Sequence, residues 1–264
     1  MKKRQCQFCQ GATGSRQTEE HIWPAWAAHL LPKRQKKREY LHIGENGFDH
    51  ITEIRREYSR QGSPSGYTVR GICKVCNGGW MSALENAAKP LLYSIVFGDS
   101  SYLSPKAVDT VSRWCFLKFC TVSILTSDIP CVTQDELNSL RSDGQISKRF
   151  SVWIYKNGSD DWRDRNAWYS SRVRTPEFQP SMAEPHNVNT FTLGFGQIIF
   201  FMILQWGVRI DPSVTGAAGA KLWRPRPGRK LHLPKEPLNV LAADDLATCL
   251  PRAVGSGKNF PPGE

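Results

Sequence analysis

The sequence predicts an α+β fold, on the evidence of three stretches of the chain. Residues 104–126 begin with Ser-Pro and repeat apolar side chains at roughly helical spacing, which indicates a long helix. A shorter helix is expected over 133–144, where Thr133 is a suitable N-cap and Gly144 a suitable stop signal. After residue 147 the chain is rich in β-branched and aromatic residues separated by Gly and Pro, which indicates a mostly antiparallel sheet.

Further strands are expected on both sides of these helices. Before them, residues 51–58 and 66–73 have the composition of short strands, with a turn-rich loop between them. After them, the expected strands of the sheet span residues 149–155, 167–173, 190–206 and 207–210. From residue 221 the chain is Pro-rich and basic, so we expect an irregular tail with one short helix over 242–250.

The chain carries a strong positive charge, +11 at pH 7 with a pI near 9.4. Such an excess favours a polyanionic partner, nucleic acid above all, because neutralising phosphates releases their counterions. The excess is densest in residues 1–90, which hold 15 Lys and Arg against 8 Asp and Glu. Solubility alone is the competing explanation, since many basic proteins bind no nucleic acid.

Two basic segments supply candidate phosphate contacts. One belongs to an expected insertion at about residues 33–70, and the other lies beside a Trp and two Pro in the tail, where it could follow a phosphate backbone. A solvated surface is the alternative for both segments. The candidate residues are Lys33, Arg34, Lys36, Lys37, Arg38, Arg224, Arg226, Arg229 and Lys230.

Nothing in the sequence indicates secretion or a membrane partner. The basic start MKKRQCQFCQ has no apolar segment of the kind found in signal peptides. The longest apolar run, 198–204, is too short to span a bilayer. We therefore expect a cytoplasmic protein, in whose reducing environment closely paired cysteines bind metal more often than they form disulfides.

Four of the eight cysteines form two CxxC pairs. Cys6 and Cys9 make the first pair, and Cys73 and Cys76 make the second. Four thiolates in two such pairs match the tetrahedral coordination of a structural Zn²⁺ ion. The alternative is that these four cysteines are buried side chains whose spacing arose by chance. We interpret the four remaining cysteines as buried, small apolar side chains.

The residues beside these pairs are TEEHIWP after the first and CKVCNGGWMSALE around the second. Together they resemble the HNH, or His-Me finger, nucleases, and most of all the zinc-stapled branch that includes endonuclease VII. The resemblance covers roughly residues 1–90 and implies a ββα-metal module. It extends to nothing in the rest of the chain.

The resemblance implies a role for three residues. His21 would be the general base that activates water, which suits an imidazole because its ordinary pKa lies near neutrality. Glu20 and Asn77 would give oxygen ligands to a catalytic Mg²⁺ or Mn²⁺ ion. Glu20 stands where the family usually has Asp, so its ligation could be direct or through water. The middle residue of the family triad is open: Asn46 is a candidate, but a turn residue is the stronger interpretation.

Helical spacing adds one further candidate ligand. If the segment after Cys76 is helical, Asn77, Met81 and Glu85 follow one another at i, i+4 and i+8 on one face. Glu85 could then also bind the catalytic ion. A solvated or Arg-paired carboxylate is an equally good interpretation.

These observations predict two domains and one leading function. Residues 1–95 form the nuclease module, and residues 96–264 form an α+β domain for DNA positioning, partner binding or dimerisation. We expect a metal-dependent HNH DNA endonuclease or nickase, of the kind found as phage-defence effectors or in phage genomes. Structured RNA remains an alternative substrate, and defence-system proteins or a second copy of the chain are candidate partners. The alternative function is a non-catalytic, zinc-dependent nucleic-acid-binding module.

Overall fold

The computed structural model describes residues 5–11, 17–24, 26–27, 68–126, 131–158, 168–173, 187–207, 212, 219–223 and 230–238. Its elements, in chain order, are β1 (Gln17–His21), β2 (Thr68–Cys73), α1 (Lys74–Cys76), the π-helical turn η3 (Asn77–Met81), α2 (Ser82–Val96), β3 (Tyr102–Leu103), α3 (Pro105–Thr126), α4 (Gln134–Asp143), β4 (Phe150–Asn157), β5 (Trp168–Val173), β6 (Val188–Phe195), β7 (Ile198–Gln205), β8 (Ala220–Trp223), β9 (Leu231–His232) and β10 (Pro237–Leu238). This mixture of helices and sheet confirms the predicted α+β class.

The six-stranded sheet has the order β10–β4–β7–β6–β5, with β8 also paired to β4. All of its pairings are antiparallel except the short parallel contact between β10 and β4, as the composition of this region predicted. The stretch 190–206 forms a tight hairpin, because Gly196 adopts a left-handed conformation with φ of 56° between β6 and β7. The expected strand at 51–58, most of the one at 207–210 and the helix at 242–250 lie outside the described residues.

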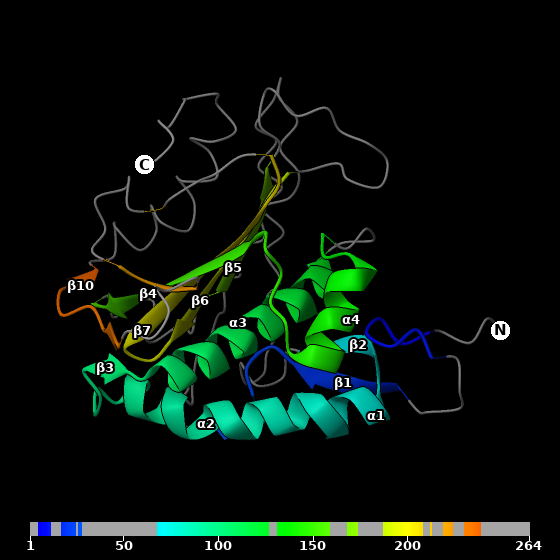
Figure 1. Ribbon diagram of the computed structural model, residues 1–264, viewed down its shortest axis with the longest axis horizontal. Helices are drawn as coiled ribbons and strands as arrows, with labels where there is room; N and C mark the ends of the chain where they lie inside the picture. Colours follow the sequence, from blue (N-terminus) through cyan, green and yellow to red (C-terminus); the bar gives the residue numbers. More distant parts are fainter. Residues whose placement is uncertain are drawn as a thin grey trace, which may run out of the picture.

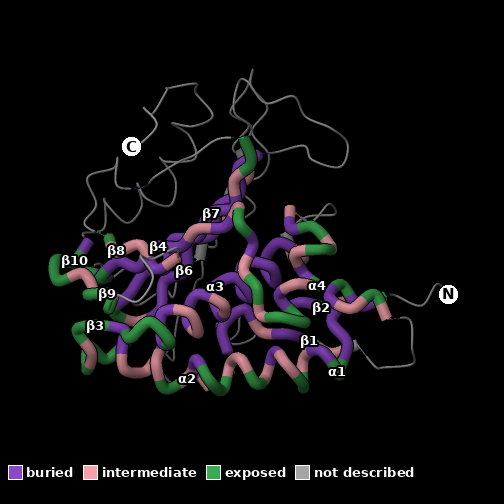
Figure 2. Tube along the Cα trace, viewed as in Figure 1, coloured by how far each residue is buried: buried purple, intermediate pink, exposed green. Residues whose placement is uncertain are grey.

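Helix α3 runs between this sheet and α2 (Figure 1). Its residues are buried along most of the helix (Figure 2), and its aromatic side chains pack directly on the sheet. Trp114 contacts Phe195 and Phe200, while Phe116 lies 4.8 Å from Phe150 between ring centroids. The apolar face predicted for residues 104–126 is therefore the centre of the hydrophobic core.

One hydrophobic cluster joins the N-terminal and C-terminal parts of the described chain. It includes Phe8 and Ile22 beside the first cysteine pair, Leu92 on α2, and sheet residues such as Phe200. The Trp23 indole N–H also donates to the Gly194 carbonyl, at 3.4 Å. Elements on either side of residue 95 thus share a core, while the division into two domains stays a prediction.

Helix α4 begins and ends at its predicted signals. Thr133 and Glu136 form a capping box, and Gly144 ends the helix in the left-handed conformation, at φ of 64°. From the first turn, Gln134 donates to the Phe8 carbonyl at 3.2 Å. The capped helix therefore helps to hold the loop of the first cysteine pair.

We expect Glu136→Gln to lower the free energy of unfolding by about 1–2 kcal/mol at neutral pH. Burial alone would raise the pKa of Glu136, but hydrogen bonds from Arg149, Ser147 and the Thr133 backbone lower it below the usual value of 4.5. A depressed carboxyl pKa stabilises the fold above that usual value, and the contribution is lost as the pH falls through the folded-state pKa. Urea unfolding at pH 7 and pH 3 should show the deficit of the variant shrinking at pH 3.

Candidate metal centre and adjoining polar site

The two cysteine pairs meet because β1 and β2 form an antiparallel pair. The Gln7 backbone N–H donates to the Gly71 carbonyl at 2.9 Å, which fastens the first cysteine loop to β2. Gly71 has φ of 113°, a conformation that side-chain-bearing residues rarely adopt. The turn at the end of β2 then continues directly into α1, which carries Cys76.

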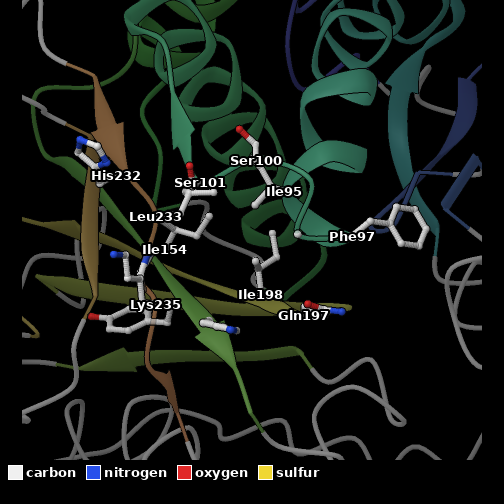
Figure 3. A pocket seen from close by; sticks show the side chains of 14 residues that line it. Ile95, Phe97, Ser100, Ser101, Ile154, Gln197, Ile198, His232, Leu233 and Lys235 are labelled. Atoms are coloured by element: carbon white, nitrogen blue, oxygen red, sulfur yellow. The ribbon is translucent and has the colours of Figure 1, made fainter.

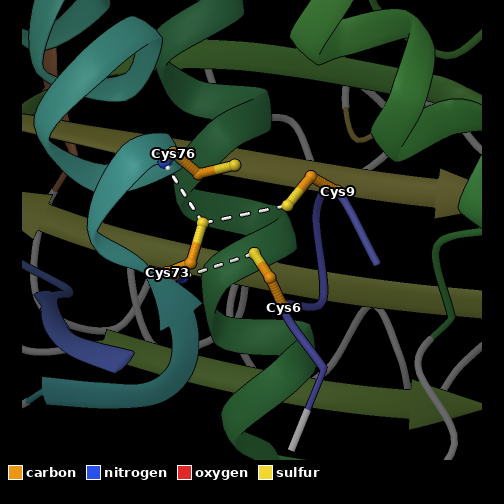
Figure 4. Close-up of side chains that lie close together, drawn as sticks. All are labelled: Cys6, Cys9, Cys73 and Cys76. Atoms are coloured by element: carbon orange, nitrogen blue, oxygen red, sulfur yellow. Dashed lines mark hydrogen bonds between the residues drawn. The ribbon is translucent and has the colours of Figure 1, made fainter. Parts of the chain in front are cut away.

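The four sulfur atoms of Cys6, Cys9, Cys73 and Cys76 all lie within 4.8 Å of one another (Figure 4). The Sγ atoms of Cys9 and Cys73 are 3.8 Å apart. A tetrahedral Zn²⁺ ion with Zn–S bonds of about 2.3 Å holds its sulfur atoms about 3.8 Å apart, so this spacing fits zinc. Backbone N–H groups also point at the sulfurs, from Cys73 to Cys6 at 3.3 Å and from Cys76 to Cys73 at 3.4 Å.

Two thiols of this cluster, Cys9 and Cys76, are in surroundings that disfavour ionisation unless a cation is present. Burial and the neighbouring sulfurs raise the pKa of the Cys76 thiol far above its usual value, and burial also raises the pKa of Cys9. A divalent ion reverses this balance because it binds thiolates. The cluster could therefore hold a structural metal such as zinc. Among the described residues, it is the one group of three or more His, Cys, Asp or Glu side chains that could share an ion.

The chain after the second cysteine pair leaves regular helical geometry for one turn. Asn77–Met81 form a π-helical turn, and inside it Gly79 departs from helical angles, with φ of −99° and ψ of −111°. A Cβ atom on Gly78 or Gly79 would meet no other atom within 4 Å. The surface beside this turn is consequently open at both glycines.

Asn77 ties the start of this turn to β1. Its Nδ2 donates to Thr18 Oγ1 at 2.9 Å and to the Glu19 carbonyl at 3.4 Å. Thr18 in turn donates to the Ile72 carbonyl at 3.1 Å, so the amide joins the helix to both strands. The Asn77 amide oxygen is left without a hydrogen bond from any described residue.

Glu20 and Glu85 meet at a lysine from α3. Lys118 is fully buried, and its Nζ lies 2.8 Å from Glu20 Oε1 and 2.5 Å from Glu85 Oε1. The side chains of Glu20 and Glu85 are 7% and 20% exposed. Burial alone would lower the pKa of the Lys118 ammonium, but the two carboxylates outweigh it and raise the pKa. The structure thus pairs both predicted metal ligands with a cation of the protein.

His21 ends β1 immediately beside this cluster. Its backbone carbonyl accepts a hydrogen bond from Lys118 Nζ at 2.9 Å. Glu20 before it and Ile22 and Trp23 after it are all buried, whereas His21 itself is half-buried. The histidine is therefore held between two anchored neighbours, with part of its side chain accessible.

Glu19 and Arg70 lie on the exposed side of the same strand pair. The Arg70 Nη2 atom is 2.8 Å from Glu19 Oε1, and its Nε donates to the same oxygen at 2.9 Å. Hydrogen bonds from Arg70 and Thr68 lower the pKa of the Glu19 carboxyl. This pair adds surface charge next to His21, with no sign of a metal-binding role.

The predicted basic contacts fall mostly outside the described residues. This applies to Lys33, Arg34, Lys36, Lys37, Arg38, Arg224, Arg226 and Arg229, and also to Asn46 and most of the expected insertion. Lys230 is described and exposed, and its ammonium lies 4.6 Å from the centroid of the Tyr102 ring.

Lys118 is the one residue of this site that the sequence interpretation missed. It stands in the segment WCFLKFC, where a helical apolar pattern surrounds a single charge. A lysine on the buried face of a helix is a usable signal, because an unpaired ammonium is rarely buried. The signal predicts buried carboxylate partners without saying which ones.

A separate cavity of about 560 Å³ lies at the far end of α2 (Figure 3). It is lined by residues from the end of α2, from β4 and from the β9 segment, among them Ile95, Ile154, His232 and Lys235. None of the predicted site residues that the structure describes lines it. The candidate site therefore consists of the cysteine cluster and the Glu20, His21, Asn77, Glu85 and Lys118 group.

Comparisons with known proteins identified no relative of the chain. No family model, curated protein or solved structure matches the chain. None of the helices in the described part combines the length and apolar character needed to cross a membrane.

Proposed function

We propose that the protein is a DNA endonuclease or nickase of the HNH type, with His21 as its general base. The observation that carries the proposal is the order of two antiparallel strands and a helix around the cysteine cluster. In this order His21 ends the first strand, and Asn77 opens the π-helical turn that follows α1 and is bonded to that strand. This order of strands and helix supports the proposal, and the positive charge of the chain favours a nucleic acid substrate.

In this proposal the residues of the chain bind and orient the substrate. The open surface at Gly78 and Gly79 admits a phosphodiester backbone close to the π-helical turn. His21 accepts a proton from the attacking water, since a half-buried imidazole can meet both water and substrate. Asn77 keeps the helix and β1 in register, so that the phosphate and the base stay aligned.

A catalytic Mg²⁺ or Mn²⁺ ion fits this site only in part. The Asn77 amide oxygen, which accepts no hydrogen bond from a described residue, is a suitable ligand, and an ion held there together with phosphate oxygens would neutralise charge on the phosphate. The carboxylates of Glu20 and Glu85 fit less well, because both already contact the Lys118 ammonium.

The same contact favours a second candidate function. If Lys118 neutralises both carboxylates for structural reasons alone, the module is a non-catalytic, zinc-dependent nucleic-acid-binding unit. His21 would then contribute only to the surface. The two functions differ in whether phosphodiester bonds are cut.

We expect the zinc-loaded protein to cut or nick supercoiled plasmid in the presence of Mg²⁺ or Mn²⁺, and His21→Ala to slow this reaction by about 10²- to 10⁴-fold. The loss follows from removing the base while the fold and the zinc are retained. Gel electrophoresis gives the rate, and open-circular or linear product distinguishes nicking from double-strand cleavage. His232→Ala, at an exposed histidine beside the separate cavity, is the matched control and should cleave normally.

Retention of zinc and DNA binding in His21→Ala shows that the variant is folded, so lost cleavage then supports the nuclease. Tight DNA binding without cleavage, by wild type and variant alike, would favour the binding module. Branched DNA and structured RNA should be tried as substrates before that conclusion is drawn.

A further inference from the structure

We propose that Lys118 is the resident cation of the Glu20 and Glu85 carboxylates, so that this pair does not bind the catalytic metal ion and instead positions His21. The inference rests on the proposed function only in the role it gives to His21. It assigns Lys118, a residue of α3 far in sequence from both cysteine pairs, to the support of the candidate active site.

The donor geometry of Lys118 carries the first part of the inference. Lys118 Nζ donates hydrogen bonds to Glu20 Oε1 and to the His21 carbonyl, and it forms an ion pair with Glu85 Oε1 at 2.5 Å. The three oxygen atoms that Lys118 contacts belong to residues of β1 and α2, while the lysine itself belongs to α3. Because the side chain is fully buried, water does not compete for these contacts.

The charges explain why a metal ion is excluded from the pair. A divalent ion bound between the same two carboxylates would lie next to the ammonium, and like charges in buried surroundings repel strongly. Asn77, whose bonds go to β1 and not to Lys118, is unaffected by this exclusion.

The positioning role follows from the contacts of Lys118 with the end of β1. Lys118 binds the carbonyl of His21 and the side chain of the residue just before it, which fixes the last peptide of β1. Glu85 links the same ammonium to α2. The Nζ atom of Lys118 therefore holds together the end of β1, α2 and α3, next to the proposed base.

The test measures binding of Mn²⁺ to the zinc-loaded full-length chain, by calorimetry and by the EPR signal of free Mn²⁺. Four proteins are compared: wild type, Glu85→Gln, Lys118→Met, and the Lys118→Met, Glu85→Gln double variant. We expect Glu85→Gln to change the affinity of the wild type for Mn²⁺ by less than about twofold. Lys118→Met should bind one Mn²⁺ at least about tenfold more tightly than wild type, and the double variant should lose that gain.

A tenfold or greater loss of Mn²⁺ affinity in Glu85→Gln would overturn the inference, as would a folded Lys118→Met that gains no Mn²⁺ binding. If Lys118→Met fails to fold, the comparison of wild type with Glu85→Gln decides alone. NMR signals of the His21 ring should move in Lys118→Met and stay in place in Lys106→Met, an exposed control on the same helix. None of these measurements needs cleavage, so they separate this inference from the nuclease proposal.

Discussion

Replacement of Cys73 by Ser should abolish zinc binding and lower the free energy of unfolding by more than about 4 kcal/mol. The serine hydroxyl is a poor zinc ligand, and Cys73 also caps α1 by accepting the Cys76 backbone N–H. Since the four sulfurs join the two cysteine loops, loss of the ion also loosens the pairing of β1 with β2. Zinc content by mass spectrometry and thermal melting would measure both effects.

Cys115→Ala is the matched control for this prediction. Cys115 is also a buried cysteine, but it lies on α3 outside the cluster. We expect the control to keep one zinc per chain and to lose only about 1 kcal/mol of stability, as for a typical core substitution. Full zinc content and wild-type melting in Cys73→Ser would contradict the assignment of the cluster as a structural metal site.

Local signals in the sequence were sufficient for much of the fold. The helix at Pro105–Thr126 and the capped helix at Gln134–Asp143 both appear where Ser-Pro, Thr133 and Gly144 predicted them. The strands of the large sheet follow the β-branched and aromatic stretches. These elements are predictable because capping, helical spacing and β composition depend on neighbouring residues.

The cysteine cluster was predictable for a different reason. The two CxxC pairs are far apart in the chain, but a metal site requires them to meet, and the structure brings all four sulfurs together. The requirement for four ligands around one metal ion predicted this long-range contact, which local sequence patterns do not reveal. The catalytic roles of Glu20, His21 and Asn77 stay predictions, since they depend on the resemblance.

The interpretation of the helix face was less complete, because it assumed regular helical geometry after Cys76. The π-helical turn over Asn77–Met81 adds a residue to the turn, and Gly79 breaks the spiral. Asn77 then bonds to β1, Met81 is buried, and Glu85 reaches Lys118. The predicted carboxylate is thus part of the candidate site, but its partner is a lysine of α3 rather than an arginine or solvent.

That partner could not be predicted from spacing, because Lys118 is 98 residues away from Glu20 in the chain. Only the packing of α3 against β1 and α2 brings Lys118 and Glu20 together. The charge content of the sequence is silent on which of its many acidic residues a buried lysine meets. A buried polar group of this kind is recognised in a structure by its contacts and its lack of exposure.

Lys118→Met should lower the free energy of unfolding by about 3–5 kcal/mol at neutral pH. Methionine has nearly the length of lysine, so packing changes little, but Glu20 and Glu85 are left facing each other in buried surroundings with no cation between them. The raised pKa of Lys118 means that its contribution is complete at neutral pH, well below the unfolded-state value of 10.5, and is lost as the pH rises through the folded-state pKa. Chemical unfolding at pH 7 would measure the deficit.

If the instability of Lys118→Met comes from unpaired carboxylate charges, removing these charges should restore stability. Adding Glu20→Gln and Glu85→Gln to Lys118→Met removes every charge of the cluster, so the triple variant should recover at least half of the lost stability. Lys106→Met, on the exposed first turn of α3, should change the stability by less than about 0.5 kcal/mol. If the triple variant were as unstable as Lys118→Met, the loss would come from packing, and the buried ammonium would have no electrostatic role beside His21.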